Sequence, residues 1–344
     1  MSNHFTDIIS SLINQQDLSY GDMQSAMKQI MSGEINPIQI SGFMVAIQIK
    51  GPTIDEIAAA AEVMREVSNK VKLTSKQNLI DTCGTGGDSL QTFNVSTLSA
   101  IVAASAGAVV AKHGGRSVSS KSGSADVLES LGVNVNLNFS QLGDLVDDIG
   151  IGFMFAPNYH PAMKHVAPVR KELKLRTIFN LLGPLTNPAS AKNQVVGVYG
   201  KELTIVFAEV LKKLGSHHVL SVNGDDGMDE ISITGKTYIA ELKNGKILEY
   251  EFNPQDYGFE LGRIEDIVVS DIESSKKMML GVLNGDKNTA RNITILNAGA
   301  ALYVSGICQD FASAFEVSGR MIDEGLAIKK LKQLIKKSNE QYFK

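Results

Sequence analysis

The sequence predicts an α/β protein: a small N-terminal helical domain, then a larger α/β domain with a mainly parallel central sheet and C-terminal helices. Two observations predict this class. Residues 1–72 show helical periodicity without the alternation of apolar and polar residues that marks a strand. From residue 77 onward, short apolar segments alternate with helical stretches, which is typical of parallel strands joined by helical crossovers.

The N-terminal helices are predicted by apolar residues at helical spacing in 8–12 and 27–31. Thr53 and Glu56 have the spacing of a capping box, in which each residue satisfies a backbone N–H of the other. An apolar helix face begins directly behind this box, at Ile57. We therefore expect residues 1–72 to contain helices only.

The α/β part is predicted to contain five strands of the parallel type and the helices between them. The expected strands are 79–82, 108–112, 152–155, 194–198 and 218–222, and the expected helices are 95–106, 124–131, 141–149 and 202–214. A longer helical stretch, 163–182, interrupts this rhythm and is expected to dock on the N-terminal helices. The predicted domains are 1–72 with 163–188, and 73–162 with 189–344.

Three short antiparallel strands are expected at 231–234, 237–242 and 247–251. Asn244-Gly245 is a strong hairpin signal between the last two, because both residues tolerate a positive φ. The expected C-terminal helices are 274–283, 290–304, 311–324 and 327–338.

Composition excludes several classes of protein. The 344 residues are 43% hydrophobic and 20% charged, with a net charge of −4, which disfavours non-specific binding of nucleic acid. Two cysteines support neither a disulfide framework nor a four-ligand zinc site. We find no signal peptide and no apolar run long enough for a bilayer, so the expectation is a cytoplasmic protein without a membrane partner.

A glycine turn between a strand and a helix is the most informative segment. Gly84, Gly86 and Gly87 follow the first expected strand, and an uncharged helix start follows at 94–97. Glycines let backbone N–H groups approach a ligand, and a helix N-terminus carries partial positive charge, so the segment is typical of a phosphate cradle. A dinucleotide fingerprint is excluded because Ser89 occupies its third glycine position. The alternative is a plain tight turn.

A second candidate segment, 112–124, follows the second expected strand. It combines Lys112, His113, Arg116 and Lys121 with glycines and hydroxyl groups, which are the donors that a diphosphate needs. The loops after neighbouring parallel strands meet at one sheet edge. The alternative is a solvated basic loop.

A third candidate segment, 223–230, is acidic and contains Asp229 and Glu230. Magnesium takes one or two carboxylates together with substrate phosphates and water, so this segment could hold it opposite a phosphate site. An acidic surface turn is the alternative.

A fourth segment, 156–161, precedes Arg170 and Arg176 on an expected helix. An arginine facing a cleft could hold a carboxylate with two parallel hydrogen bonds, but the sequence pattern alone favours the alternative, a salt-bridged surface helix. His113 and His160 are each ambiguous between structural and catalytic roles, and Cys83 is most simply a small buried residue.

Together these segments closely resemble the anthranilate phosphoribosyltransferase family over nearly the whole chain, in order and with matching spacing. The matching stretches are 84–88, 92–97, 112–114, 116–127, 157–163, 176–188 and 229–230. The resemblance implies the fold shared with pyrimidine nucleoside phosphorylases and a homodimer formed through the helical domains. It implies transfer of a phosphoribosyl group from phosphoribosyl diphosphate to the amine of anthranilate, with magnesium, in the second step of tryptophan biosynthesis from chorismate.

The resemblance also assigns roles to residues. Those that would bind phosphoribosyl diphosphate are Gly84, Gly87, Asp88, Thr92, Asn94, Val95, Ser96, Thr97, Lys112, His113, Gly114, Gly115, Arg116, Ser117, Val118, Ser119, Ser120 and Ser124. Those at the anthranilate side are Gly84, Gly115, His160, Arg170 and Pro184. Ser96, Asp229 and Glu230 would hold two magnesium ions per subunit. The residues expected to carry catalysis are Lys112, Arg170, Asp229 and Glu230.

One position departs from the family pattern. The family usually has asparagine after Lys-His-Gly, where this chain has Gly115. The loss of that amide predicts weaker or shifted binding of the acceptor, with the diphosphate site intact. Two alternatives are a pyrimidine nucleoside phosphorylase-like enzyme, in which the acidic pair has no role, and a non-catalytic nucleic-acid-binding relative, which should have a basic groove.

Overall fold

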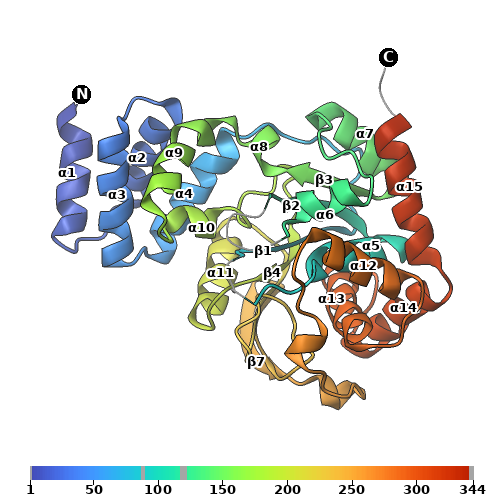
Figure 1. Ribbon diagram of the computed structural model, residues 1–344. Helices are drawn as coiled ribbons and strands as arrows, with labels where there is room; N and C mark the ends of the chain where they lie inside the picture. Colours follow the sequence, from blue (N-terminus) through green and yellow to red (C-terminus); the bar gives the residue numbers. More distant parts are fainter. Residues whose placement is uncertain (1, 87–89, 117–121, 341–344) are drawn as a thin grey trace.

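The computed structural model describes residues 2–86, 90–116 and 122–340, and the chain begins with the predicted bundle of helices (Figure 1). Its helices are α1 Ser2–Ile13, α2 Tyr20–Ser32, α3 Pro37–Lys50 and α4 Ile54–Glu66. The capping box of Thr53 and Glu56 is confirmed, with both reciprocal hydrogen bonds present. The prediction that the described part of 1–72 contains helices and no strand is confirmed.

The helical stretch predicted over 163–182 docks on the N-terminal helices as expected, but it is not one continuous helix. The chain forms three short helices there: η1 Pro161–His165, α9 Ala167–Leu173 and α10 Ile178–Leu182. Lys174 ends α9 because it adopts a left-handed φ of 51°, and Thr177 starts α10 with a new cap. The three helices pack in the same hydrophobic cluster as α1–α4. That cluster continues into the α/β part, so the proposed division into two domains stays a prediction.

A seven-stranded sheet in the order β3-β2-β1-β4-β5-β6-β7 forms the centre of the molecule. The five parallel strands are β1 Leu79–Gly84, β2 Val109–Gly114, β3 Ile151–Phe155, β4 Asn193–Gly197 and β5 His218–Gly224. All five predicted strands are confirmed, and each of their boundaries lies within two residues of the predicted one. The helices between them are α5 Val95–Ser105, α6 Ser124–Ser130, α7 Phe139–Ile149, α8 Ala156–Tyr159 and α11 Glu202–Lys213.

The hairpin predicted at Asn244-Gly245 is confirmed. β6 Thr237–Lys243 and β7 Lys246–Phe252 pair antiparallel, and Asn244 and Gly245 have φ values of 53° and 74°. The strand predicted at 231–234 is wrong. Ile231 exchanges both backbone hydrogen bonds with the side-chain amide of Asn297, at 2.9 Å each, so its backbone needs no partner strand.

The chain ends in helices, as predicted. They are α12 Ile272–Leu283, α13 Thr289–Ser305, α14 Phe311–Asp323 and α15 Leu326–Glu340, preceded by the short helices η2 Pro254–Tyr257 and η3 Ile264–Asp266. The core lies on both faces of the sheet because neighbouring strand residues point to opposite sides: Val195 packs with α5 and α13, whereas Val196 packs with α11 and the N-terminal helices. In the described residues no helix is both long and apolar enough to cross a bilayer.

Candidate active site

The predicted site residues gather at the carboxyl ends of the parallel strands. From β1 the chain adds β2 and β3 on one side of the sheet, and then β4 and β5 on the other. Ligands of open α/β sheets bind outside the strand ends at such a point of reversal. β1, β2 and β4 all end in glycine at this edge, at Gly84, Gly114 and Gly197.

Asp229 lies directly against the ends of β1 and β4. Its Oδ2 accepts a hydrogen bond from the backbone N–H of Gly86 at 2.9 Å. A Cβ atom added at Gly84 would lie 2.6 Å from Oδ2 of Asp229, and one added at Gly197 would lie 1.6 Å from its carbonyl oxygen. Position 197 therefore requires glycine, because Gly197 faces the backbone of Asp229, and a side chain at Gly84 would displace the carboxylate of Asp229 from its observed position. Gly197 is a residue that sequence reasoning missed, although a glycine inside an apolar strand signals close approach of backbone.

Lys112, Ser96 and Glu230 form a second group at this edge. The buried Nζ of Lys112 donates to the carbonyl oxygen of Thr82 and to Oγ of Ser96, the latter at 3.1 Å. The backbone N–H of Ser96 donates to Oε1 of Glu230 at 3.0 Å. Burial lowers the pKa of Lys112, and nearby carboxylates, Asp81 first, oppose that shift. The ammonium is thus held close to Ser96 in strongly acidic surroundings.

Asp81 organises the region beneath this group, and sequence reasoning missed it. It is fully buried, and its carboxylate accepts hydrogen bonds from the backbone N–H of His113 at 3.0 Å and from Nδ2 of Asn187 at 2.8 Å. Nδ2 of Asn187 also donates to the carbonyl oxygen of Ala111 at 2.9 Å. Burial raises the pKa of Asp81, while these donors and Lys112 oppose the shift. The only signal in the sequence is an acidic residue inside an apolar strand.

His113 and His160 form a hydrogen-bonded pair with a defined direction. Nδ1 of His113 lies 3.2 Å from the carbonyl oxygen of Gly183, which can only accept, so Nδ1 carries the proton. The Nε2 atoms of the two rings are 3.2 Å apart, so His160 is the donor between them. Burial lowers the pKa of His113 to about 3 and that of His160 to about 4, and both rings are therefore neutral at pH 7.

Asn94 holds the start of α5 in place. Its Oδ1 accepts hydrogen bonds from the hydroxyls of Ser122 and Ser275, each at 2.8 Å, and its Nδ2 donates to the carbonyl oxygen of Ser122. Because the amide is used in this way, Asn94 makes no side-chain cap for α5. Ser275 lies on α12, far along the chain, and could not be found from sequence spacing.

Two predicted arginines behave differently. Arg116 is directed to α6, where it makes ion pairs with Asp126 at 2.8 Å and Glu129 at 2.5 Å. Arg170 is partly buried on α9, and burial lowers its pKa. Within the described residues no hydrogen bond or ion pair engages its guanidinium or joins it to the other predicted site residues. Arg176 lies over the ring of Tyr199 at 4.3 Å.

The remaining predicted residues lie at the same edge or beside it. Thr92 pairs in a short bridge with Val268, and the carbonyl oxygen of the buried Pro184 accepts from Gln194 at 2.9 Å. Val95 and Thr97 are buried in the first turn of α5, Ser124 begins α6, and Gly115 follows Gly114 at the end of β2. The predicted residues that lie outside the described residues are Gly87, Asp88, Ser117, Val118, Ser119 and Ser120.

The oxygen atoms at this edge fit magnesium. The backbone N–H of Ser96 donates to Glu230, which brings the hydroxyl oxygen of Ser96 and the carboxylates of Glu230 and the adjacent Asp229 to the same place. Among the described residues no group of three or more His, Cys, Asp or Glu side chains could hold a metal by itself. Magnesium that is held by one or two carboxylates and completed by substrate phosphates and water needs no such group.

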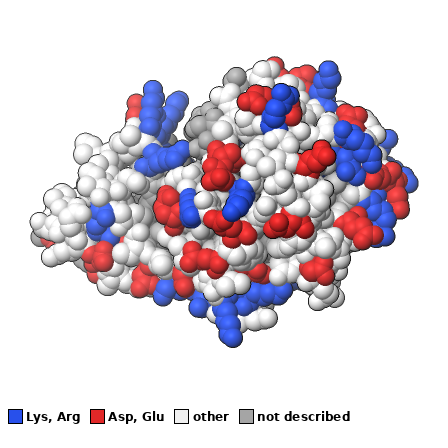
Figure 2. Space-filling model, turned by 90° about the horizontal axis from the view of Figure 1, so that it is seen from below, with Lys and Arg blue, Asp and Glu red and all other residues white. Residues whose placement is uncertain are grey.

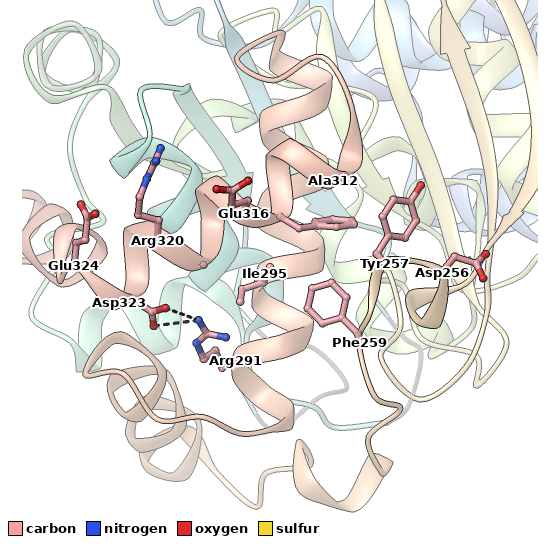
Figure 3. A pocket seen from close by; sticks show the side chains of 12 residues that line it. Asp256, Tyr257, Phe259, Arg291, Ile295, Ala312, Glu316, Arg320, Asp323 and Glu324 are labelled. Carbon is pink, nitrogen blue, oxygen red and sulfur yellow. Dashed lines mark hydrogen bonds and ion pairs between the residues drawn. The ribbon is translucent and has the colours of Figure 1, made fainter.

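A separate pocket lies between α13, α14 and η2 (Figure 3). It measures about 840 Å³, and its walls include the rings of Tyr257 and Phe259 and the ion pair of Arg291 with Asp323. It contains none of the residues predicted from the sequence. The candidate site therefore rests on the strand ends and not on this pocket.

Comparison with known proteins agrees with this geometry. Residues 76–328 match the model of the glycosyl transferase family, a/b domain, and residues 6–68 match that of the helical bundle domain of the same family. The chain is 52% identical over 326 residues to the anthranilate phosphoribosyltransferase of Methylobacillus flagellatus, covering 95% of this chain and 96% of that one. It is also 52% identical over 327 residues to the enzyme of that name from Chromobacterium violaceum, with the same coverage.

Solved structures show the same fold. The anthranilate phosphoribosyltransferase of Thermus thermophilus superimposes with a TM-score of 0.91 at 36% identity, covering 97% of this chain and 99% of that one. The enzyme of that name from Saccharomyces cerevisiae, in complex with PRPP and Mg, superimposes with a TM-score of 0.90 at 28% identity, covering 99% of both chains.

Proposed function

The chain belongs to the anthranilate phosphoribosyltransferases of the glycosyl transferase family, and from that premise we propose which of its residues carry the reaction. The chain transfers the phosphoribosyl group of phosphoribosyl diphosphate to the amine of anthranilate in tryptophan biosynthesis, with magnesium. One observation supports this assignment of residues. Lys112, Ser96, Asp229 and Glu230 lie together at the carboxyl ends of the strands, where the order of the strands in the sheet reverses.

The leaving diphosphate is the group that needs most stabilisation. Breaking its bond to C1 of the ribose leaves positive character on the sugar and builds negative charge on the diphosphate. Lys112, together with the N–H groups of the glycine turn and of α5, is placed to stabilise that charge, at a few kcal/mol for each donor. Magnesium held by Ser96, Asp229 and Glu230 supplies further positive charge to the phosphate oxygens.

The acceptor needs orientation more than deprotonation, because an aromatic amine is already unprotonated at neutral pH. Arg170 is the residue proposed to orient it, through two parallel hydrogen bonds to the anthranilate carboxylate. Its partly buried guanidinium has no protein acceptor among the described residues, so it can receive that carboxylate without first breaking an ion pair. Gly84, Gly115, His160 and Pro184 are proposed to shape the acceptor side.

The Arg170 assignment predicts a selective loss. Arg170→Ala should raise the KM for anthranilate at least tenfold, because hydrogen bonds to a charged group contribute about 1.5–3 kcal/mol each. The KM for phosphoribosyl diphosphate should change little. Lys171→Ala, an exposed position on the same helix, is the matched control. An unchanged KM for anthranilate in Arg170→Ala would remove this residue from the acceptor site.

Three finer statements are proposals as well. We propose two magnesium ions per subunit, which manganese titration in the presence of diphosphate can count by paramagnetic resonance. We propose a homodimer formed through the helical part of the chain. A cytoplasmic location is proposed because both cysteines, Cys83 and Cys308, are free thiols in the structure.

The reaction is tested by the loss of anthranilate fluorescence on addition of phosphoribosyl diphosphate, with and without magnesium. We expect decay that needs the metal and that is abolished by the double change Asp229→Ala/Glu230→Ala. If the wild-type chain binds phosphoribosyl diphosphate in a calorimeter but shows no decay, the donor site is supported and the acceptor is another amine. Gly115 would then be the first position to examine.

The nucleic-acid-binding alternative receives no support from the surface seen in Figure 2. On that face lysines and arginines are interspersed with aspartates and glutamates, without the continuous basic stripe that a polyanion would need. No nucleic-acid partner is therefore proposed.

A further inference from the structure

The two acidic residues among the proposed metal ligands, Asp229 and Glu230, already accept hydrogen bonds from two backbone N–H groups of the predicted phosphate cradle. Glu230 accepts the backbone N–H of Ser96, in the first turn of α5, at 3.0 Å. Asp229 accepts the backbone N–H of Gly86, in the glycine turn, at 2.9 Å. The resemblance assigns the acidic pair to the metal and Ser96 to both the metal and the substrate, and Gly86 belongs to the glycine turn expected to cradle phosphate. The structure brings the acidic pair into direct contact with the N–H groups of both residues.

The contact at α5 replaces a helix cap. The first N–H groups of a helix have no partner within the helix, and an anion is favoured there. Asn94, the N-cap residue, does not satisfy them, because Ser122 and Ser275 engage its side-chain oxygen. Glu230, 134 residues beyond Ser96, accepts at this helix end instead. Its carboxylate has the charge and the acceptor oxygens that a phosphate group would bring to the same donor.

The contact at the glycine turn is held in place by the strands. Asp229 lies in close contact with the ends of both β1 and β4. A Cβ atom added at Gly84 or at Gly197 would overlap it. Asp229 and Glu230 are consecutive, so the packing of Asp229 against the two strand ends also positions Glu230 at α5. Both carboxylates are only partly buried, so solvent and ligands can reach them.

We propose that the carboxylates of Asp229 and Glu230 are internal competitors of the substrate diphosphate for the N–H groups of Gly86 and Ser96. The inference rests on the proposed function of this site. Without a divalent cation the acidic pair both occupies these donors and repels the incoming phosphates. A divalent cation offers the carboxylates another partner and frees the donors. The acidic pair thereby makes diphosphate binding conditional on the metal.

Isothermal titration with inorganic diphosphate tests this competition, once in excess EDTA and once with magnesium. Glu230→Ala frees the donor at α5, so its affinity for diphosphate in EDTA should be about tenfold or more tighter than that of the wild type. Glu230→Gln keeps an acceptor but loses the charge, and should show a smaller gain. Asp225→Ala is the matched control, because it removes one exposed carboxylate from the same loop without freeing either donor.

The outcomes separate this inference from the proposed function. A gain in EDTA for Glu230→Ala that Asp225→Ala does not share supports the competition. No gain in either Glu230 variant, or an equal gain in Asp225→Ala, overturns it, while metal-dependent binding by the wild type would leave the proposed function intact. If the wild type fails to bind diphosphate even with magnesium, the donor site itself is wrong and the inference falls with it.

Discussion

At the residue scale, the burial of His113 and His160 determines the pH below which the folded protein loses stability. Removal from water disfavours the charged imidazolium, and this lowers the pKa of His113 to about 3 and that of His160 to about 4. The neighbouring ring lowers the pKa of His113 further, and Lys70 does the same for His160. Both rings lie 5% exposed between the end of β2 and the segment around Gly183.

These pKa values predict a loss of stability on mild acidification. An unfolded histidine has a pKa near 6.5, so between that value and about 4 the unfolded chain binds more protons than the folded chain. Stability is therefore complete above pH 6.5 and falls below it by about 1.4 kcal/mol per pH unit for each ring. Between pH 7.5 and 5.0 the pair should cost about 2–4 kcal/mol in urea unfolding.

Variants separate this loss from the titration of other groups. His160→Gln keeps a donor near the position of Nε2 but cannot be protonated, so its loss of stability on acidification should be about half that of the wild type. His217→Gln, at an exposed position, should behave as the wild type. Equal acid sensitivity in all three proteins would contradict the assignment to the buried pair.

Gly115 is a second position where a single residue is expected to change a measurable property, here the KM for anthranilate. Among the described residues a Cβ atom there would meet nothing within 4 Å, and the φ of Gly115 is not left-handed, so the backbone accepts a side chain at this position. A restored amide should lower the KM for anthranilate about 2- to 10-fold, the effect of one neutral hydrogen bond. Gly115→Ala fills the same space without the amide and should not lower it. If the asparagine leaves the KM for anthranilate unchanged, the predicted weakness at this position is wrong.

Spacing could identify the residues of the site that are contiguous in sequence, such as Lys112 at a strand end or the adjacent Asp229 and Glu230. It could not identify partners supplied by distant segments. Asp81 and Asn187 meet across 106 residues, and Ser275 reaches Asn94 across 181. Nor could it show that the acidic pair contacts the N–H groups of the phosphate cradle, because that contact depends on the packing of β1 against β4.

At the element scale, α4 depends on a buried carboxylate as well as on its cap. Glu56 is 0% exposed, and it accepts hydrogen bonds from the backbone N–H groups of Leu18 and Thr53 at 2.8 and 2.7 Å. It also pairs at 2.9 Å with Lys50, whose side chain is 4% exposed. The capping box could be predicted from Thr53 and Glu56, but the link to α3 and to the start of α2 could not.

This arrangement predicts that Glu56→Ala destabilises the protein far more than the loss of a cap. The change removes the buried partner of Lys50, which keeps only its ion pair with the exposed Asp17. It also leaves the N–H groups of Leu18 and Thr53 without this acceptor. We expect a cost of about 3 kcal/mol, at the lower end of the range for breaking a buried ion pair. Thr53→Ala, which removes only the cap, should cost about 1 kcal/mol. Glu62→Ala on the exposed side of the same helix is the matched control and should cost less than 1 kcal/mol. Similar losses for Glu56→Ala and Glu62→Ala in urea unfolding would contradict this role.

The predictions of a strand at 231–234 and of a continuous helical stretch over 163–182 failed for the same physical reason. Periodicity predicts which residues are buried but not what satisfies the backbone. The buried segment 231–234 uses the side chains of Asn297 and Thr237 as hydrogen-bond partners instead of a strand. The apolar face of 163–182 continues through three separate helices, because a left-handed residue at Lys174 turns the chain without exposing that face.

At the scale of the whole molecule, the parallel strands could be predicted from the sequence because they are short apolar segments that alternate with helical stretches. The order of the strands needed the structure, since periodicity does not reveal that β4 returns to the free side of β1. That return creates the switch point where Gly84, Gly197 and Asp229 meet, and the site is therefore a property of topology as much as of motif.

The helical part of the molecule carries an apolar face that the described residues of the chain leave exposed. Ile38 on α3 is 83% exposed and Ile49 is 73% exposed, and Gly42 and Val45 lie between them at helical spacing on the same face. Ile13, at the end of the neighbouring α1, is 66% exposed. The opposite face of α3 is buried, so this helix is apolar on both sides. A two-fold interface with a second copy would cover the exposed face, which supports the proposed homodimer.

The dimer proposal predicts a mass of two 37.0 kDa chains in sedimentation velocity for the wild type. Ile38→Glu/Ile49→Glu places two charges on each side of the proposed interface, facing their copies, and should yield the single-chain mass. Leu248→Glu is the matched control, because this residue is 64% exposed on β7, in the α/β part, and its variant should keep the mass of the wild type. A dimer that persists in the double variant would place the interface on another face. A single-chain mass for the wild type would contradict the homodimer itself, and the uncovered face of α3 would then need a different partner.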